Sequence, residues 1–219
     1  IHIVPLGVEH AFFSPGNQEA ARSALGLPSG PILMYVGRLQ SLKGVDVAIR
    51  TLKELEDRQV TLLIVGGASG ADGDAHEQNL RELMKKLPVR NQVIFIPPQP
   101  HHILSTYYRA SDLVLVPSRS ESFGLVALES TACGTPVIAA AVGGLKDLID
   151  HGYNGVLVDG WNPTDYKNAV KELLSNPLLS TEMAMNAAEK AKDFSWGQTA
   201  DDLIDIYTSI LSSALVDCR

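Results

Sequence analysis

The sequence predicts an α/β protein with a doubly wound, Rossmann-like parallel sheet and helices at its C-terminal end. Short apolar runs, each bounded by glycine, proline or polar residues, alternate with longer amphipathic stretches from residue 31 onward. The runs are apolar at consecutive positions, as expected of strands that helices cover on both faces. Beyond Pro163 the strand-like runs stop and the pattern becomes helical.

The elements follow in order along the chain. Gly37 ends the first strand, Pro88 stops the second helix, and Pro163 and Pro177 each mark a helix start. A last amphipathic helix over 196–213 carries an apolar stripe that must pack on this domain's own sheet or on a partner domain. The expected strands cover residues 31–37, 60–67, 93–96, 112–118, 135–140 and 155–158, and the expected helices between them cover 44–58, 75–87, 101–110, 124–132 and 145–150.

Composition limits the possible ligands. The chain has 219 residues and a formal net charge of −7, which suits one domain with its own core. An acidic chain lacks the diffuse positive field that nucleic-acid binding needs, so no nucleic-acid partner is expected. An anionic ligand must therefore be held by a few local cations and backbone N–H groups. The two cysteines, Cys133 and Cys218, indicate no disulfide framework, and a cytoplasmic location is expected.

Two cations follow the first expected strand directly. Arg38 and Lys43 lie in the segment GRLQSLKG, where Gly37 and Gly44 allow a close approach to a ligand. Ligands of such sheets bind at the carboxyl ends of the strands. An arginine supplies a planar fork and a lysine a mobile point charge, so the pair suits a phosphate clamp. Two solvated surface cations are the competing interpretation, and the spacing alone favours neither.

The loop after residues 112–118 runs straight into a helix. Gly124 and Leu125 are expected at the helix N-terminus, where free N–H groups and the helix dipole favour an anion. Glu121 and Glu129 form an E-x7-E spacing, which places the second glutamate about 1.5 turns into the helix. Carboxylates are poor phosphate ligands but good acceptors for the hydroxyls of ribose and a sugar. The plainer alternative is that both glutamates only solvate the surface.

The remaining motifs carry weaker signals. In the segment PPQP (97–100), prolines fix backbone groups around Gln99 that could recognise a planar base, although a rigid turn is the commoner explanation. The pair HH (101–102) has no third ligand nearby, so no metal site is expected. The segment GGASG (66–70) fails the dinucleotide fingerprint because Val65 stands where its first glycine belongs. The missing fingerprint argues against the alternative that this chain is half of a Rossmann dehydrogenase.

An ordered set of segments resembles the donor-binding domain of the family 4 retaining glycosyltransferases, which have the two-domain GT-B architecture. The resemblance covers nearly the whole chain, and it is the order of the pieces that makes it specific. The matching segments are VPLGVE, VGRLQSLKG, LIVGGASG, YRASDLVLVPSRSESFGLVALESTACGTPVIAAAVGGLKDLI and GYNGVLVD.

The resemblance implies roles for individual residues. Arg38 and Lys43, preceded by Gly37, fall where the family holds the donor diphosphate. Glu121 falls where the family contacts the transferred sugar. Arg38 and Lys43 would stabilise the charge of the leaving diphosphate, and with Glu121 they are the expected catalytic residues. Transfer would retain the anomeric configuration, with no metal and no cofactor needed.

Further residues match the family's nucleotide contacts. Phe123, Gly124 and Leu125 match the segment whose backbone meets sugar and phosphate. Glu129 matches the glutamate that holds the ribose hydroxyls, and Gln99 lies where backbone groups meet the nucleobase. The expected donor is a nucleoside-diphosphate hexose or N-acetylhexosamine, with UDP preferred over GDP or ADP.

The resemblance also implies a domain organisation. Residues 1–30 are expected to form an interdomain linker and lead-in, 31–194 the nucleotide-sugar-binding domain, and 195–219 a crossover helix and tail. The expected partner is an N-terminal, acceptor-binding domain of the same chain, without which this half binds nucleotide but does not turn over. A lipid acceptor would place the enzyme peripherally at the membrane. A non-catalytic nucleotide-sugar-binding or regulatory module is the alternative.

Overall fold

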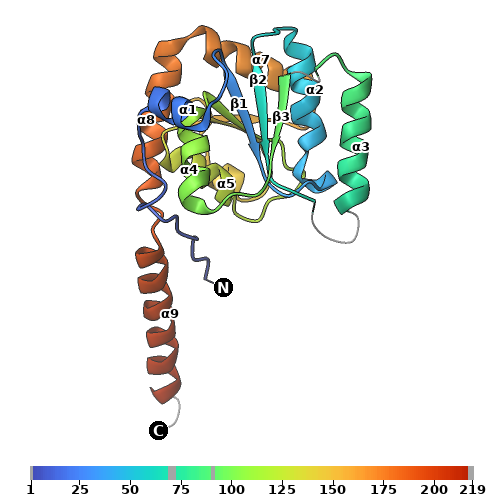
Figure 1. The fold of residues 1–219 in the computed structure, drawn as a ribbon. Coiled ribbons are helices and arrows are strands. Elements are labelled where there is room, and N and C mark those ends of the chain that lie inside the picture. The colour runs from blue at the N-terminus through green and yellow to red at the C-terminus, as the bar shows by residue number, and fades with distance from the viewer. Residues whose placement is uncertain (1, 69–72, 90–91, 217–219) are drawn as a thin grey trace.

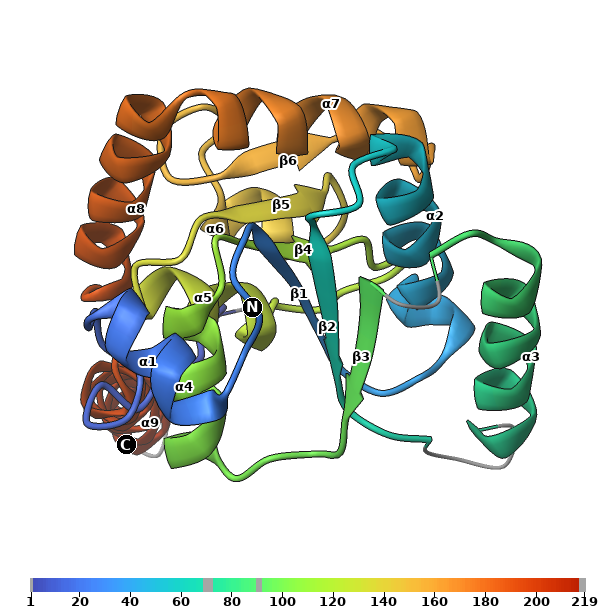
Figure 2. The same ribbon diagram turned by 45° about the horizontal axis from the view of Figure 1, so that its top comes forward.

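A computed structural model describes residues 2–68, 73–89 and 92–216. In this part of the chain a six-stranded, all-parallel sheet has the order β3-β2-β1-β4-β5-β6. Helices cover both of its faces (Figures 1 and 2), so the predicted doubly wound α/β fold is confirmed. The strands are β1 (Ile32–Val36), β2 (Thr61–Val65), β3 (Val93–Ile96), β4 (Leu113–Val116), β5 (Val137–Ala140) and β6 (Val156–Val158).

The predicted helices all form, with ends shifted by a few residues. Two elements were not predicted: α1 (Gln18–Leu25) and the single 3-10 turn η1 (Ser41–Lys43). The remaining helices are α2 (Val45–Leu55), α3 (Gly73–Lys86), α4 (His101–Ala110), α5 (Leu125–Ala132), α6 (Leu145–Leu148), α7 (Pro163–Ser175), α8 (Pro177–Ala191) and α9 (Trp196–Val216). The rejected dinucleotide segment at 66–70 and Cys218 lie partly or wholly outside the described residues.

The core forms one apolar layer on each face of the sheet. Alternate side chains of β1 show the division, since Leu33 and Tyr35 pack toward α2 and α7, whereas Ile32 and Met34 pack toward α4 and α5. All four side chains are almost fully buried. Strands that are buried on both faces explain why the apolar runs in the sequence are continuous rather than alternating.

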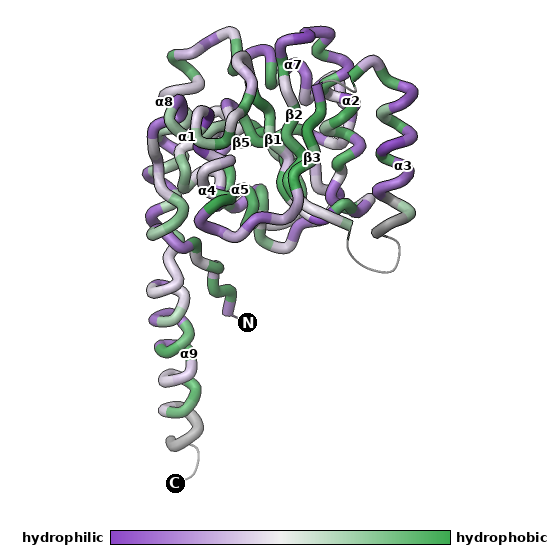
Figure 3. The backbone as a smooth tube through the Cα atoms, in the orientation of Figure 1, coloured by the Kyte–Doolittle hydropathy of each residue, from purple (hydrophilic) through white to green (hydrophobic). Residues whose placement is uncertain are grey.

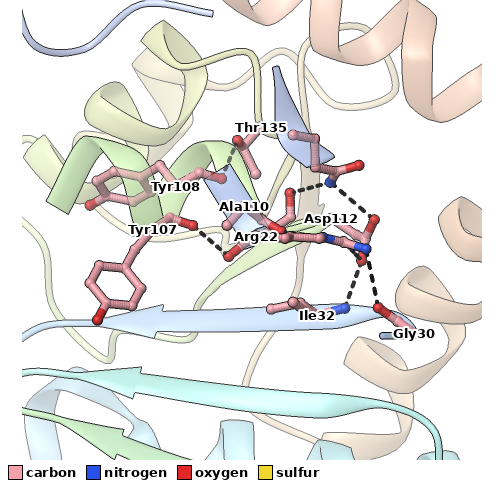
Figure 4. A network of polar contacts seen from close by, with 10 residues as sticks. Arg22, Gly30, Ile32, Tyr107, Tyr108, Ala110, Asp112 and Thr135 are labelled. Atoms are coloured by element: carbon pink, nitrogen blue, oxygen red, sulfur yellow. Dashed lines mark hydrogen bonds and ion pairs between the residues drawn. The ribbon is translucent and has the colours of Figure 1, made fainter. Parts of the chain in front are cut away.

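A polar network fixes α1 at the amino ends of β1 and β4, as Figure 4 shows. The Arg22 guanidinium donates to the Ala110 carbonyl at 2.8 Å and pairs with the Asp112 carboxylate at 2.7 Å. The same carboxylate accepts the Ile32 N–H at 2.6 Å. This network ties residues of the lead-in to the opposite end of the sheet from the expected ligand site, and it serves the fold.

The last helix leaves the body of the domain. The start of this helix is held by a bridge between Val8 and Ser195, just before it, and by the Thr199 hydroxyl in its first turn, which donates to the Pro5 carbonyl at 2.8 Å. Beyond this point α9 projects away from the sheet (Figure 1), and its apolar positions appear as green bands in Figure 3. Its stripe therefore does not pack on this domain's own sheet. Among the α9 side chains that the structure describes, up to residue 212, the exposed large apolar ones are Trp196, Leu203, Ile204, Tyr207, Ile210 and Leu211. Among the described helices, none is long and apolar enough to cross a membrane.

Candidate functional site

The strand order of the sheet reverses between β1 and β4. The chain runs outward in one direction from β1 to β3 and in the other from β4 to β6, so β1 and β4 are neighbours at the switch point. Segments 37–44 and 117–124 follow these two strands directly. In open parallel sheets this crevice at the carboxyl ends is the preferred ligand site. The two loops predicted to carry the site are thus brought side by side.

An ion pair joins the two loops. The Lys43 ammonium donates to the Glu121 carboxylate at 2.7 Å, and these side chains are only 25% and 17% exposed. The Ser118 hydroxyl donates to the same carboxylate oxygen at 3.3 Å. These groups line a small cavity of about 30 Å³ at the ends of β1 and β4. The cavity is lined by Tyr35, Val36, Gly37, Lys43, Val116, Ser118, Glu121 and Val126.

Arg38 differs from Lys43 in its surroundings. Its residue is exposed, and it is its backbone carbonyl that is engaged, accepting the Tyr35 hydroxyl at 3.1 Å. Gly37 before it has φ +147°, and a Cβ on Gly66 would stand 1.9 Å from the Gly37 carbonyl oxygen. The β1 loop is therefore packed closely on the loop after β2. Lys43 lines the cavity at the ends of β1 and β4, whereas the exposed Arg38 does not.

Helix α5 begins beside the ion pair. Its N-cap is Gly124, with φ +109°, and the cap is not made by a side chain. The ring of Phe123 packs against Phe194 with centroids 6.1 Å apart, which fixes the entry of the chain into the helix. Leu125 is 39% exposed. The first-turn N–H groups of α5 are thus presented at the same edge of the sheet as Lys43.

Glu129 is held by a partner that the sequence did not indicate. The Tyr108 hydroxyl, on α4, donates to its carboxylate at 2.8 Å, and Tyr108 itself is fully buried. Burial raises the pKa of Glu129, while the Tyr108 hydrogen bond and the charge of His101 oppose the rise. Tyr108 lies 21 residues before Glu129, and no local pattern links the two positions.

Two predicted contacts lie apart from the cavity. Glu129, which lies within α5, does not line the space around Glu121, which precedes that helix. The Gln99 amide donates to the Pro97 carbonyl at 2.9 Å within the loop after β3, which is the edge strand and is separated from β1 by β2. The side chain of His101 packs on Phe13 at a centroid distance of 5.6 Å. The structure thus brings Lys43 and Glu121 together at one cavity, which Arg38, Glu129 and Gln99 do not line.

Burial of a carboxylate costs stability when the carboxylate is ionised, so Glu129→Gln is expected to stabilise the chain. The folded state binds the Glu129 proton more tightly than the unfolded chain because its pKa is raised. The stability that this bound proton contributes is lost as the pH rises from the ordinary pKa of a glutamate toward the raised pKa of Glu129. A glutamine keeps an acceptor for the Tyr108 hydroxyl without a charge. We expect the Tm of the Glu129→Gln variant to exceed the wild-type Tm by about 2–4 °C at pH 7 and by less at pH 4.

Scanning calorimetry at the two pH values measures this difference. Glu182→Gln, at an exposed position on α8, makes the same chemical change without the burial. A glutamine variant at 129 that melts at or below the wild-type temperature at pH 7 contradicts the expected cost of the buried charge.

Comparison with known proteins identifies the family. Residues 17–194 match the family model described as glycosyl transferases group 1. The D-inositol 3-phosphate glycosyltransferase of Acidothermus cellulolyticus is 45% identical over 219 residues, and the match covers 97% of this chain and 48% of that protein. The chain therefore spans about half the length of the curated relatives that it matches.

Solved structures agree with this assignment. Sucrose-phosphate synthase from Thermosynechococcus elongatus superimposes with a TM-score of 0.90 at 32% identity, over 97% of this chain and 53% of that one. Anabaena HepE, solved with UDP-glucose, has the same fold, with a TM-score of 0.88 at 24% identity over 95% of this chain and 57% of that one. The C-terminal domain of the Francisella tularensis group 1 protein LpcC gives a TM-score of 0.78 at 26% identity, over 85% of this chain and 97% of that domain. The chain belongs to the group 1 glycosyltransferase family, within which it corresponds to the C-terminal domain.

Proposed function

We propose that this chain binds the nucleoside-diphosphate sugar donor of a retaining glycosyltransferase, with UDP as the nucleotide. The observation that carries the proposal is the partly buried Lys43–Glu121 pair at the switch point of the sheet, beside the N-terminus of α5. A cation, free N–H groups and a carboxylate at one edge match a phosphate joined to a hydroxylated sugar. HepE, which shares the fold, was solved with UDP-glucose, and this favours UDP.

On binding, the diphosphate would replace Glu121 as the partner of the Lys43 ammonium. A phosphate oxygen would compete with the Glu121 carboxylate for the Lys43 ammonium, and the exposed Arg38 side chain would approach the same anion from the loop after β1. The backbone of Phe123, Gly124 and Leu125 supplies N–H groups at the positive end of the α5 dipole. Released from its ion pair, Glu121 can accept a hydroxyl hydrogen bond from the transferred sugar.

The nucleoside would extend along the sheet edge away from this pair. The Tyr108 hydroxyl occupies one oxygen of Glu129, and the other is available for a ribose hydroxyl. Backbone groups of the Pro97–Pro100 loop, with Gln99, would meet the base. A partly buried carboxylate that Tyr108 holds in one direction is pre-oriented, which lowers the entropic cost of binding.

The proposed reaction transfers a hexose or N-acetylhexosamine to an acceptor hydroxyl with retention. The bond from the anomeric carbon to the diphosphate breaks, and the acceptor oxygen bonds to that carbon on the same face. The acceptor proton passes to an oxygen of the leaving diphosphate. Lys43, Arg38 and the α5 N-terminus stabilise the negative charge that develops on the leaving group. The acceptor would bind to a further, N-terminal domain of the complete protein, in the cytoplasm.

Calorimetric titration with UDP, GDP, ADP and NAD tests the proposal. We expect selective UDP binding, weakened by Glu129→Ala by about 1–3 kcal/mol because buried hydrogen bonds to ribose are lost. Glu182→Ala, at an exposed position on α8, is the matched control and should bind like the wild type. NAD binding without nucleoside-diphosphate binding would overturn the proposal, as would a Glu129→Ala variant that keeps wild-type affinity.

A further inference from the structure

The local backbone structure around Lys43 and around Glu121 does not by itself hold either side chain in place. Lys43 ends η1, a single 3-10 turn without a side-chain cap, and Ser41 and Leu42 in that turn are exposed. Short turns of this kind have poor hydrogen-bond geometry and gain little stability of their own. Glu121 lies in the irregular segment between β4 and α5. The 2.7 Å contact therefore depends on further bonds that tie the two segments to each other.

Arg119 connects the two segments through both backbone and side chain. Its backbone N–H donates to the Leu42 carbonyl at 2.7 Å. Its guanidinium donates to the Ser41 carbonyl, and it also forms two parallel bonds, of 3.1 and 3.0 Å, to the two carboxylate oxygens of Asp46. Asp46 stands in the first turn of α2, where the helix dipole favours a carboxylate. Arg119 thus fixes the two residues that precede Lys43 and the helix that follows it.

The position of Arg119 in the chain makes it a link between the ion-pair partners. It bonds to the residue directly before Lys43, and it stands two positions before Glu121. The backbones are also in close contact here, since a Cβ on Gly44 would stand 2.0 Å from the Pro117 carbonyl oxygen. Arg119 does not line the cavity at the ends of β1 and β4, so it is a positioning residue that would act on a ligand there through the segments that carry Lys43 and Glu121.

We propose that Arg119 and Asp46 form a clamp that positions Lys43 for the donor diphosphate. The inference rests on the proposed function, and it adds positioning residues outside the binding cavity. Both side chains are about two-thirds buried, with exposures of 32% and 28%, so the pair is shielded more than a surface ion pair. The planar fork of arginine matches the carboxylate in a way that a lysine cannot reproduce.

The experiment combines two readouts on Arg119→Gln, Asp46→Asn and the double variant. Hydrogen exchange in the ligand-free chain follows the η1 amides, where the Lys43 and Gly44 N–H groups donate to Gln40 and Ser41 carbonyls at 3.0 and 3.2 Å. Exchange there should become faster in each variant and remain unchanged in α3. Calorimetry should show UDP affinity falling about 5- to 10-fold while uridine affinity stays within about twofold. The double variant should bind no more weakly than the poorer single one, because both remove the same contact.

Arg81→Gln breaks an exposed ion pair on α3 and should change neither readout. Equal losses for UDP and uridine, or unchanged η1 exchange, would overturn the clamp. Absence of UDP binding in the wild type would overturn the proposed function instead, and the exchange data would still decide whether Arg119 holds η1.

Discussion

Replacing Lys43 by alanine is expected to lower UDP affinity about 10- to 100-fold and to leave uridine affinity within about twofold, since a charge-assisted hydrogen bond contributes about 1.5–3 kcal/mol. The expected loss is large because the substitution removes a partly buried cation and also leaves the Glu121 carboxylate without the ammonium that lies 2.7 Å from it. An uncompensated carboxylate beside a diphosphate repels it. Titration of the variant with UDP and uridine measures both affinities.

A second substitution separates these two contributions. In Lys43→Ala/Glu121→Gln the repulsive charge is gone, so part of the lost UDP affinity should return while uridine binding stays unchanged. Lys192→Ala is the matched control, because it breaks a lysine–glutamate pair at the end of α8 whose side chains are 66% and 73% exposed. If UDP and uridine lose affinity equally in Lys43→Ala, the lysine does not bind the diphosphate.

The fold was largely predictable because burial leaves a direct mark on the sequence. Strands covered on both faces must be apolar at successive positions, so Ile32–Val36 and Thr61–Val65 are evident without any structure. Helix α1 was missed because it buries little; of its eight residues only Ala21 is fully buried. Its ends do carry signals, an Asn17 side chain that caps the N-terminus and a left-handed Gly26 at the C-terminus.

The candidate site could be predicted from the sequence at the level of loops but not of contacts. Strand-end cations and a glycine before a helix indicate where an anion can bind, and parallel strands bring their loops to one edge. The partners depend on chain segments that meet only in the folded state. Lys43 and Glu121 are 78 residues apart, and Arg119 and Asp46 are 73 apart, so no spacing rule relates them.

The glycines after β5 show how the fold fixes the glutamate of the site. Gly143 has φ +48°, and a Cβ at this position would stand 1.8 Å from the Glu121 carbonyl oxygen. The next residue, Gly144, donates its N–H to that same oxygen at 3.2 Å. The backbone of the β5–α6 connection therefore lies directly against the segment that carries Glu121, and only a residue without a side chain permits this approach.

Gly143→Ala is consequently expected to destabilise the chain and to displace Glu121, whereas Gly152→Ala should do little to the site. Gly152 also has a left-handed φ, +80°, but a Cβ on this residue would meet no other group within 4 Å. Both variants carry the strain of a non-glycine residue at positive φ, about 1–2 kcal/mol. Only Gly143→Ala adds a collision with backbone, which should cost about 1–3 kcal/mol more in urea unfolding.

The same pair of variants tests whether Glu121 belongs to the donor site. Displacement of Glu121 disturbs its ion pair with Lys43. UDP affinity should therefore fall about tenfold or more in Gly143→Ala and remain near wild type in Gly152→Ala. Because the two substitutions share their chemistry and backbone strain, the difference between them isolates the contact with Glu121. Equal unfolding free energies in the two variants would contradict the collision. Equal UDP affinities, with Gly143→Ala less stable, would show that the backbone of Glu121 can shift without disturbing the diphosphate, and Lys43 would then bind it independently of its carboxylate partner.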